Sequence, residues 1–266
     1  MALIFDQSFT LLNEEQSVKL FNLLLWSSQA FGTLSVLCVG LWFGRYGEGF
    51  SWTESAEHEF NYHPMFMVTG MVFIYGEAIL AYRIFRNEKK KFSKSIHVAL
   101  HSVVLLFMLI ALKAVFDFHN LKTDAQGKPT PIPNMMSLHS WIGMFVVVTF
   151  CIQYIAGFVT YFFPGLPLSF RGLFMPFHQL GGVLIFMSVG TTVALGISER
   201  AAWKHTCWTV KHEFCAQHVV SSFSGIFSFI YIINVLILVL NPRWKRKPLP
   251  EEDSTRYLFE GHEMMD

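Results

Sequence analysis

Four histidines, His63, His97, His139 and His178, stand at the entry ends of four consecutive apolar segments. Imidazole at the edge of a hydrocarbon layer is costly unless it is ligated or hydrogen-bonded, so each is a candidate functional residue. A chain that crosses a membrane repeatedly reverses direction each time, which places His63 and His139 near one face and His97 and His178 near the other. Two same-face pairs from facing helices are what two six-coordinate haems, one above the other, would require. The chemistry indicated is transmembrane electron transfer.

Simple hydrogen bonding to a neighbouring carbonyl or hydroxyl is the alternative for any single membrane histidine, but four at matching depths favour ligands. His101 lies one helical turn after His97 on the same face, and spacing alone does not choose between them. His218 starts the last crossing and has no same-face partner in the sequence. The loop histidines are expected to be solvated: His58, His205 and His212.

The composition is that of a membrane protein. Of the 266 residues, 53% are hydrophobic and only 15% are charged, whereas a soluble domain carries about 25% charged residues. Six stretches have the roughly 20 apolar residues that a spanning helix needs: 19–43, 62–82, 97–118, 136–160, 176–197 and 218–240. We therefore predict an all-α membrane protein with six transmembrane helices, of which the second to fifth form a four-helix haem-binding bundle. The net charge of +1 gives no indication of a nucleic-acid partner.

The basic residues predict the orientation. Both dense basic clusters, between Arg83 and Lys94 and between Arg243 and Lys247, fall on the side of the two termini. The positive-inside rule then makes that side cytoplasmic. The expected organisation is a cytoplasmic N-terminal segment (1–18), a six-helix transmembrane domain (19–242) and a cytoplasmic C-terminal tail (243–266). No cleaved signal peptide is expected, because the first residues are acidic and polar.

Four runs of sequence resemble the cytochrome b561 family: 60–64, 94–101, 134–143 and 175–178. The most specific are Ser-Leu-His-Ser-Trp around His139 and Pro-x-His ending at His178. The resemblance extends from roughly residue 20 to residue 245. It implies a di-haem, ascorbate-dependent transmembrane oxidoreductase, usually a homodimer, with His63 paired to His139 and His97 to His178 through two haem b groups. Family members often lack the second histidine of the third helix, which favours His97 over His101.

The resemblance also implies two substrate sites. Cytoplasmic ascorbate would be held by Arg83, Lys90, Lys94 and Arg171, although these cations could be topology signals only. The lumenal or extracellular acceptor would lie at His119 and Asn120, near the Lys113–Asp117 pair, whose i, i+4 spacing permits a salt bridge. We expect a ferric chelate as the acceptor, with monodehydroascorbate as the alternative. A quinol-linked cytochrome subunit and a non-redox transporter with proton-relaying histidines are further alternatives.

The sequence does not identify which cellular membrane holds the protein. Plasma membrane, endosome or lysosome, and secretory vesicle all fit a multi-pass protein with cytoplasmic termini. Cys207 and Cys215 share a lumenal loop with His205 and His212. In an oxidising compartment a disulfide is favoured there over a zinc site or free thiols.

Overall fold

The computed structural model describes residues 12–52, 54–250 and 252, and in these residues the protein is built from helices. Six helical segments are long and apolar enough to cross a membrane, so the predicted all-α six-helix fold is confirmed. Part of the predicted N-terminal segment (1–11) and most of the tail (251 and 253–266) lie outside the described residues.

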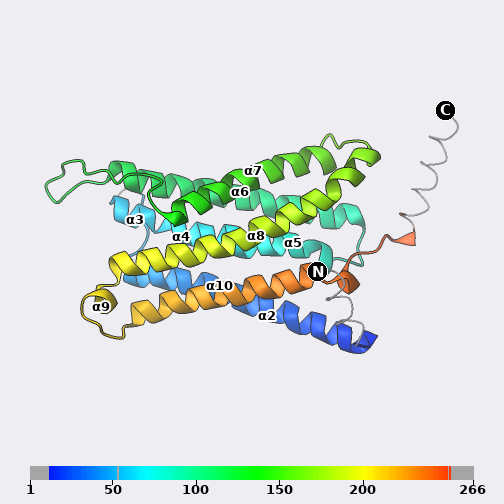
Figure 1. Ribbon diagram of the computed structural model, residues 1–266, viewed down its shortest axis with the longest axis horizontal. Coiled ribbons are helices and arrows are strands. Elements are labelled where there is room, and N and C mark those ends of the chain that lie inside the picture. The colour runs from blue at the N-terminus through cyan, green and yellow to red at the C-terminus, as the bar shows by residue number, and fades with distance from the viewer. Residues whose placement is uncertain (1–11, 53, 251, 253–266) are drawn as a thin grey trace.

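The six crossings follow one another along the chain, and the longest connection between them, residues 122–137, projects from one end of the bundle (Figure 1). They are α2 (Glu14–Leu41) with π-helical η1 (Trp42–Tyr46); α3 (Ala56–Phe60), α4 (Tyr62–Phe66), π-helical η2 (Met67–Ile74) and α5 (Tyr75–Ile84), which form one crossing; α6 (Lys90–Leu121); α7 (Leu138–Tyr161); α8 (Leu168–Lys204); and α10 (Ala216–Leu240). Two short elements, α9 (Thr206–Thr209) and η3 (Pro242–Trp244), follow α8 and α10.

Several helices extend beyond their apolar segments. Helix α6 begins at Lys90 rather than 97, and α8 runs from Leu168 to Lys204 rather than from 176 to 197. The hydropathy pattern marks only the part of a helix that lies in hydrocarbon, whereas backbone hydrogen bonding continues through polar turns outside it. The connections before and after α8 are therefore shorter than the gaps between the predicted apolar stretches.

Side-chain caps set several helix starts. The side chain of Asn13 accepts a hydrogen bond from the backbone N–H of Gln16 at 2.8 Å, and the Gln16 side chain accepts one from the backbone N–H of Asn13 at 3.0 Å. Ser137 Oγ accepts from the N–H of Ser140 at 3.2 Å, which begins α7 one residue before His139. A capped start fixes the first turn, and with it the direction of the His139 side chain.

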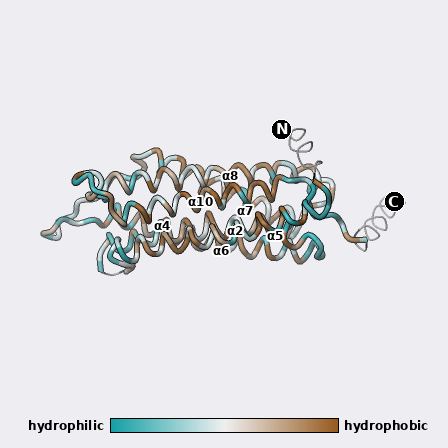
Figure 2. Tube along the Cα trace, turned by 90° about the horizontal axis from the view of Figure 1, so that it is seen from below, coloured by the Kyte–Doolittle hydropathy of each residue, from teal (hydrophilic) through white to brown (hydrophobic). Residues whose placement is uncertain are grey.

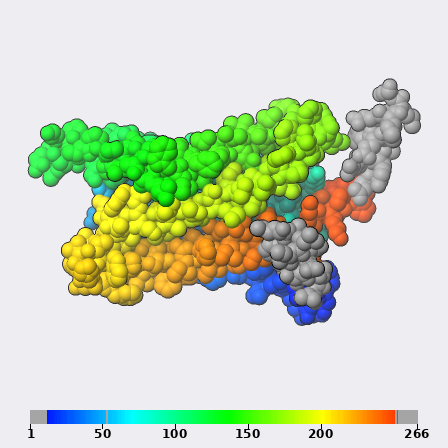
Figure 3. Space-filling view, viewed as in Figure 1, coloured from blue at the N-terminus to red at the C-terminus, as the bar shows by residue number. Residues whose placement is uncertain are grey.

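The helices lie side by side along the long axis, with α8 between α7 and α10 on the face seen in Figure 3. Helices α2 and α10 pack closely through small buried residues, including Ser35, whose hydroxyl is 2.6 Å from that of Ser228. Small residues allow membrane helices to approach and polar ones link them. This packing places the first and last crossings against the bundle of the other four.

Apolar residues fill the middle of the molecule and polar residues collect at its two ends (Figure 2). The outer faces of α7 and α8 are strongly apolar yet exposed, for example Phe177 at 67% and Trp141 at 63%. An outward apolar surface of this kind is suited to lipid.

Candidate functional site

His63 and His139 face each other at one end of the bundle. His63 lies on α4 and His139 is the second residue of α7, and their ring centroids are 6.1 Å apart. The Nδ1–H of His63 donates to the carbonyl of Ala111 at 3.1 Å, and that of His139 donates to the carbonyl of Thr192 at 2.9 Å. A carbonyl only accepts, so Nδ1 must carry the proton and the Nε2 lone pair of each ring is left for a metal.

His97 and His178 form the equivalent pair at the other end. His97 on α6 and His178 on α8 have ring centroids 6.3 Å apart, and the Nδ1–H of His97 donates to the carbonyl of Ala78 at 2.8 Å. The rings thus project from four different crossings, and neighbouring helices hold three of them by the same type of hydrogen bond. Such bonds orient a ligand ring and raise its basicity.

Both pairs have the spacing of imidazoles that share one metal. A metal ion held in line between two rings by bonds of about 2 Å separates their centroids by about 6 Å. The observed distances, 6.1 and 6.3 Å, match this value. The residues present therefore fit two six-coordinate haem irons.

Two glycines make room for one ring of each pair. A Cβ atom on Gly196 of α8 would lie 2.7 Å from Cε1 of His139, and one on Gly157 of α7 would lie 2.8 Å from Cε1 of His178. Real Cβ atoms essentially never approach this closely, so any side chain would push the ring away. Sequence reasoning missed both glycines, because only the assembled bundle shows which ring each one faces.

His101 has a different environment from His97. Its ring packs between Tyr75, at 4.8 Å, and Phe150, at 5.9 Å, and it lies only 4.5 Å from the ring of His97. That separation is too short for a metal between the two rings. His97 is therefore the histidine of α6 that faces His178 at ligand spacing, while His101 is buried beside it.

A basic cavity of about 400 Å³ opens beside the His97–His178 end. It contains three of the four predicted ascorbate residues and three further residues, and its lining is Lys90, Lys91, Lys94, Ser95, Phe162 and Arg171. The fourth predicted residue, Arg83, does not line it: its guanidinium donates to the carbonyl of Val239 on α10. Arg83 therefore acts in the packing of α5 against α10.

Tyr161 connects this cavity to His178. Its carbonyl accepts a hydrogen bond from Nζ of Lys94 at 2.9 Å, and its ring lies 5.3 Å from that of His178. The guanidinium of Arg171 donates to the carbonyl of Leu166, within the turn before α8. Backbone carbonyls therefore hold two cations of the cavity, Lys94 and Arg171, and the ring of Tyr161 lies between the cavity and His178.

His119 and Asn120 lie together at the far end of α6, near the His63–His139 pair. The Nδ1–H of His119 donates to Oδ1 of Asn134 at 2.9 Å, and Nδ2 of Asn134 donates to Oδ1 of Asn120 at 3.0 Å. The loop folds back onto the helix end, since the N–H of Ile132 donates to the carbonyl of His119 at 2.8 Å. This arrangement leaves Nε2 of His119 available to a ligand.

Asp117 does not join His119. Lys113 bonds its carboxylate, as the i, i+4 spacing predicted, and also donates to Glu59 at 3.2 Å. This end of α6 therefore offers an imidazole and two amides rather than an imidazole and a free carboxylate.

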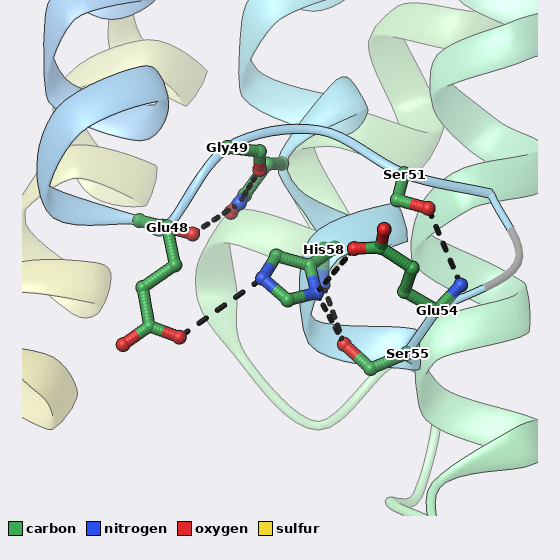
Figure 4. Close-up of polar contacts among 8 residues, drawn as sticks. Glu48, Gly49, Ser51, Glu54, Ser55 and His58 are labelled. Atoms are coloured by element: carbon green, nitrogen blue, oxygen red, sulfur yellow. Dashed lines mark hydrogen bonds and ion pairs between the residues drawn. The ribbon is translucent and has the colours of Figure 1, made fainter.

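The loop that leads into the second crossing is ordered by polar contacts (Figure 4). Ser55 Oγ lies 2.8 Å from Nδ1 of His58, whose ring is also within 4.0 Å of Glu48 and Glu54. The side chain of His58 is 22% exposed, so it is partly shielded by these contacts rather than fully solvated. Asn61 donates to the carbonyls of Gly47 and Gly49 at 2.7 and 2.6 Å, two residues before His63.

In the connection between α8 and α10, Cys207 and Cys215 form the disulfide that the sequence favoured. The histidines of this connection agree with expectation only in part. His212 is exposed, as expected, but His205 is fully buried, so its predicted solvation is wrong. Its ring lies 5.8 Å from that of His218, the partner that the sequence did not provide. Burial, followed by the neighbouring His218 and Arg200, lowers the pKa of His205, which keeps the ring neutral at neutral pH.

Together the fold and the paired histidines define an all-helical membrane protein with two facing imidazole pairs, one towards each end of the bundle. The eukaryotic cytochrome b561 family model matches residues 62–204, which include all four paired histidines. The chain belongs to this family, and membership implies haem b binding.

Several curated proteins are similar in sequence to this chain over most of its length. It is 60% identical, over the full length of both proteins, to the putative transmembrane ascorbate-dependent reductase CYB561 homolog of Caenorhabditis elegans. It is 36% identical over 231 residues to the plasma membrane ascorbate-dependent reductase CYBRD1 of Rattus norvegicus, covering 85% of this chain and 77% of that protein. Identity is also 36% over 228 residues to the transmembrane ascorbate-dependent reductase CYB561 of Homo sapiens, covering 85% and 86%.

Proposed function

We propose that this protein carries electrons across a membrane from ascorbate, bound at the basic cavity, to an acceptor at the His119 end. The observation that carries the proposal is the presence of two imidazole pairs at opposite ends of one bundle, one of them beside a cavity lined by cations. The relatives' names, ascorbate-dependent reductases, support the choice of donor.

One haem b is assigned to His63 and His139 and a second to His97 and His178. Haem b held between two imidazoles supplies an iron that is reversibly reduced by one electron. The protein's own part is to fix the rings: the carbonyls of Ala111, Thr192 and Ala78 hold the Nδ1–H groups, while Gly157 and Gly196 let rings approach their neighbouring helices.

At the donor end, the cations of Lys90, Lys94 and Arg171 would attract the ascorbate anion and favour loss of its proton as the electron leaves. Ascorbate has a single negative charge, and a cavity lined by one sign of charge raises the local concentration of an oppositely charged substrate. Tyr161 would separate the bound donor from His178 by a single aromatic side chain.

At the acceptor end we favour a ferric chelate. The Nε2 atom of His119 can serve as a metal ligand because Nδ1 is engaged with Asn134. Monodehydroascorbate is the second candidate acceptor. As an anion it would be expected to need a cation, and the nearby Lys113 is already paired with Asp117 and Glu59.

The central test uses vesicles of known orientation that contain ascorbate, with a ferric chelate outside. We expect ferrous chelate to form outside at a rate that depends on internal ascorbate, and a pyridine haemochrome assay to give two haems per chain. A value near one would contradict the two-haem assignment, and a value near zero would favour a non-redox transporter. Reduction by quinol but not by ascorbate would favour the quinol-linked alternative.

The donor site is tested by neutralising Lys94 and Arg171 together. The Lys94→Ala, Arg171→Ala variant should be reduced by ascorbate several-fold more slowly, while dithionite reduction and haem content are unchanged. Lys247→Ala is the matched control, because Lys247 is an exposed cation near the same end but outside the cavity. Because exposed charges are screened, the wild-type rate should also fall as salt rises. If the rate of reduction by ascorbate is unchanged, these basic residues serve only to set the orientation of the protein in the membrane.

The acceptor site is tested by His119→Ala. This change should lower the rate of ferrous-chelate formation without altering the haem spectrum, because His119 is not one of the paired histidines. If iron reduction is absent while monodehydroascorbate oxidises the protein rapidly, the ferric acceptor is wrong and the electron pathway stands.

A further inference from the structure

The buried pair His205 and His218 has no role in the proposed electron transfer. His205 is the C-cap of α8 and is fully buried, and neither of its ring nitrogens has a hydrogen-bond partner. His218, in the first turn of α10, also has a buried Nδ1 atom without a partner. Buried polar atoms are normally satisfied, so three unpartnered nitrogens in two adjacent rings require an explanation.

Aromatic contacts hold both rings but leave these nitrogens unused. The indole of Trp208 stacks on His218 with centroids 5.2 Å apart and planes 6° apart. The edge of Trp42 lies against His205, with centroids 5.4 Å apart. The disulfide between Cys207 and Cys215 closes the loop between the two histidines. The pair is therefore positioned by its surroundings without being hydrogen-bonded by them.

The separation of the two rings matches that of imidazoles that share a metal ion. Their centroids are 5.8 Å apart and their planes are perpendicular. In-line coordination with bonds of about 2 Å predicts about 6 Å, and the pairs His63–His139 and His97–His178 show 6.1 and 6.3 Å. The close His97–His101 pair, at 4.5 Å, shows that neighbouring histidines in this protein do not adopt this distance by default.

The ligand set selects the kind of metal. Among the described residues, no group of three or more His, Cys, Asp or Glu side chains could hold a metal ion, whereas zinc takes four ligands. Cu(I) accepts two ligands in line, binds imidazole, and adds only one positive charge. A small charge matters here because the guanidinium of Arg200 lies close enough to His205 to disfavour further positive charge there.

We propose that His205 and His218 bind one Cu(I) ion in a two-coordinate site beneath the loop closed by the Cys207–Cys215 disulfide. His205 lies nine residues after Gly196, which faces His139, and this spacing is about 13 Å along a helix. The site thus lies beyond the His63–His139 pair, towards the same end of the molecule, and does not depend on haem or ascorbate.

The test measures Cu(I) retention by the haem-loaded protein under anaerobic conditions, with bicinchoninate as the competing chelator. Wild-type protein should keep one copper per chain. His205→Gln and His218→Gln should each weaken binding about tenfold or more. The matched control is His212→Asn, an exposed histidine of the same loop whose φ of 55° asparagine tolerates. X-ray absorption should show two nitrogen ligands in wild-type protein.

The haem spectrum reports whether each variant is folded. His205 is fully buried, so His218→Gln, at a partly exposed position, tests the same site if His205→Gln misfolds. Copper retained equally by wild-type protein and a folded His218→Gln variant would overturn the proposal, as would sulfur ligands or the absence of copper from wild-type protein. If wild-type protein fails to bind copper but is reduced by ascorbate, the copper site is wrong and the proposed function is unaffected. If it binds copper but is not reduced by ascorbate, the proposed function is wrong and the copper site is unaffected.

Discussion

At the scale of single residues, the histidine pairs depend on what lies behind each ring as much as on the rings. His139 and His178 rest against glycines of a neighbouring helix, and His63, His97 and His139 each donate Nδ1–H to a backbone carbonyl. A ligand ring that is fixed in this way keeps Nε2 directed across the bundle. Changes to residues that never touch a metal should therefore alter metal binding.

Gly196→Ala provides the sharpest residue-scale test. The new methyl group would lie 2.7 Å from Cε1 of His139, so the ring must move and its nitrogen leaves the position opposite His63. We expect haem content to fall by up to one haem per chain, measured by pyridine haemochrome, with the His97–His178 signal retained.

Gly172→Ala is the control for this change, because nothing lies within 4 Å of the added methyl group in the same helix. It should leave the spectrum unchanged and stabilise the helix by up to about 1 kcal/mol. Normal haem content in the Gly196→Ala variant would contradict the close packing of the His139 ring against Gly196.

At the scale of elements, a polar seam links the crossings α2, α5 and α10. The hydroxyl of Tyr231 donates to the carbonyl of Phe73 at 2.8 Å and to Glu77 at 3.0 Å, and Glu77 also accepts from Nε2 of Gln29 at 2.8 Å. Side-chain hydrogen bonds between membrane helices fix which faces meet, because alternative pairings leave polar groups in hydrocarbon. The seam therefore sets how the first and last crossings dock on the four crossings that carry the paired histidines.

Tyr231→Phe should destabilise this docking. The change removes the hydroxyl that donates to Glu77 and to the carbonyl of Phe73. Leaving these buried groups without a partner should lower the free energy of unfolding by about 1–3 kcal/mol. The expected result is a lower thermal unfolding temperature in detergent with an unchanged haem spectrum. Ser188→Ala, which removes only an exposed hydroxyl bonded within its own helix, should leave the temperature unchanged. An equal effect of both substitutions would contradict a specific role for the seam.

The segment after α10 docks on the start of α6 beside the basic cavity. The carboxylate of Glu252 accepts from the backbone N–H of Lys90 at 2.7 Å, the N–H of Leu249 at 3.1 Å and the guanidinium of Arg246 at 2.6 Å. Burial alone would raise the pKa of Glu252, but these hydrogen bonds together lower it to about 2. The contact is therefore ionised throughout the neutral range.

This pKa shift predicts a pH dependence with a definite sign. A lowered folded-state pKa stabilises the docked segment above the ordinary value of 4.5, and the stabilisation is lost as pH falls from 4.5 towards 2. Hydrogen exchange at the amides of Lys90 and Leu249, corrected for intrinsic rates, should rise over that interval. Glu252→Gln should show fast exchange at all pH values, whereas Glu88→Gln should behave as wild type. Exchange that is independent of pH in wild-type protein would rule out the carboxylate as the anchor.

At the scale of the whole molecule, the start of α2, the end of α10 and the basic cavity lie at one end, and α9 lies at the other (Figure 1). Contacts between distant parts of the chain agree: Arg243 donates to the carbonyl of Leu12, and Arg246 donates to that of Glu88. We expect this end to be cytoplasmic, because the dense basic clusters lie there.

Sealed vesicles test the sidedness. Where a C-terminal tag is accessible from outside, external ascorbate should reduce the protein within the dead time of mixing, and an external ferric chelate should not reoxidise it. In vesicles where the tag is inaccessible from outside, external ascorbate should not reduce the protein, and an external ferric chelate should reoxidise it. Reduction by ascorbate only from the side opposite the tag would contradict the assigned donor end.

The sequence by itself determined the class of fold and which histidines share an end of the bundle. Hydropathy is a local property, so six apolar stretches were enough to predict six helices, and reversal of the chain at each connection was enough to put His63 and His139 at one end and His97 and His178 at the other. Resemblance to the cytochrome b561 family, rather than spacing, favoured His97 over His101. Resemblance to the cytochrome b561 family had singled out Lys90, Lys94 and Arg171, and all three line the basic cavity.

Only the tertiary structure decided how these residues are supported and which others join them. Gly157, Gly196 and the carbonyls that hold the histidines act across helices, and no spacing within one helix reveals such contacts. For the same reason Arg83 turned out to serve the packing of α10, and the loop histidine His205 proved to be buried against His218. Burial depends on what folds back over a residue, which is decided by segments far away in the sequence.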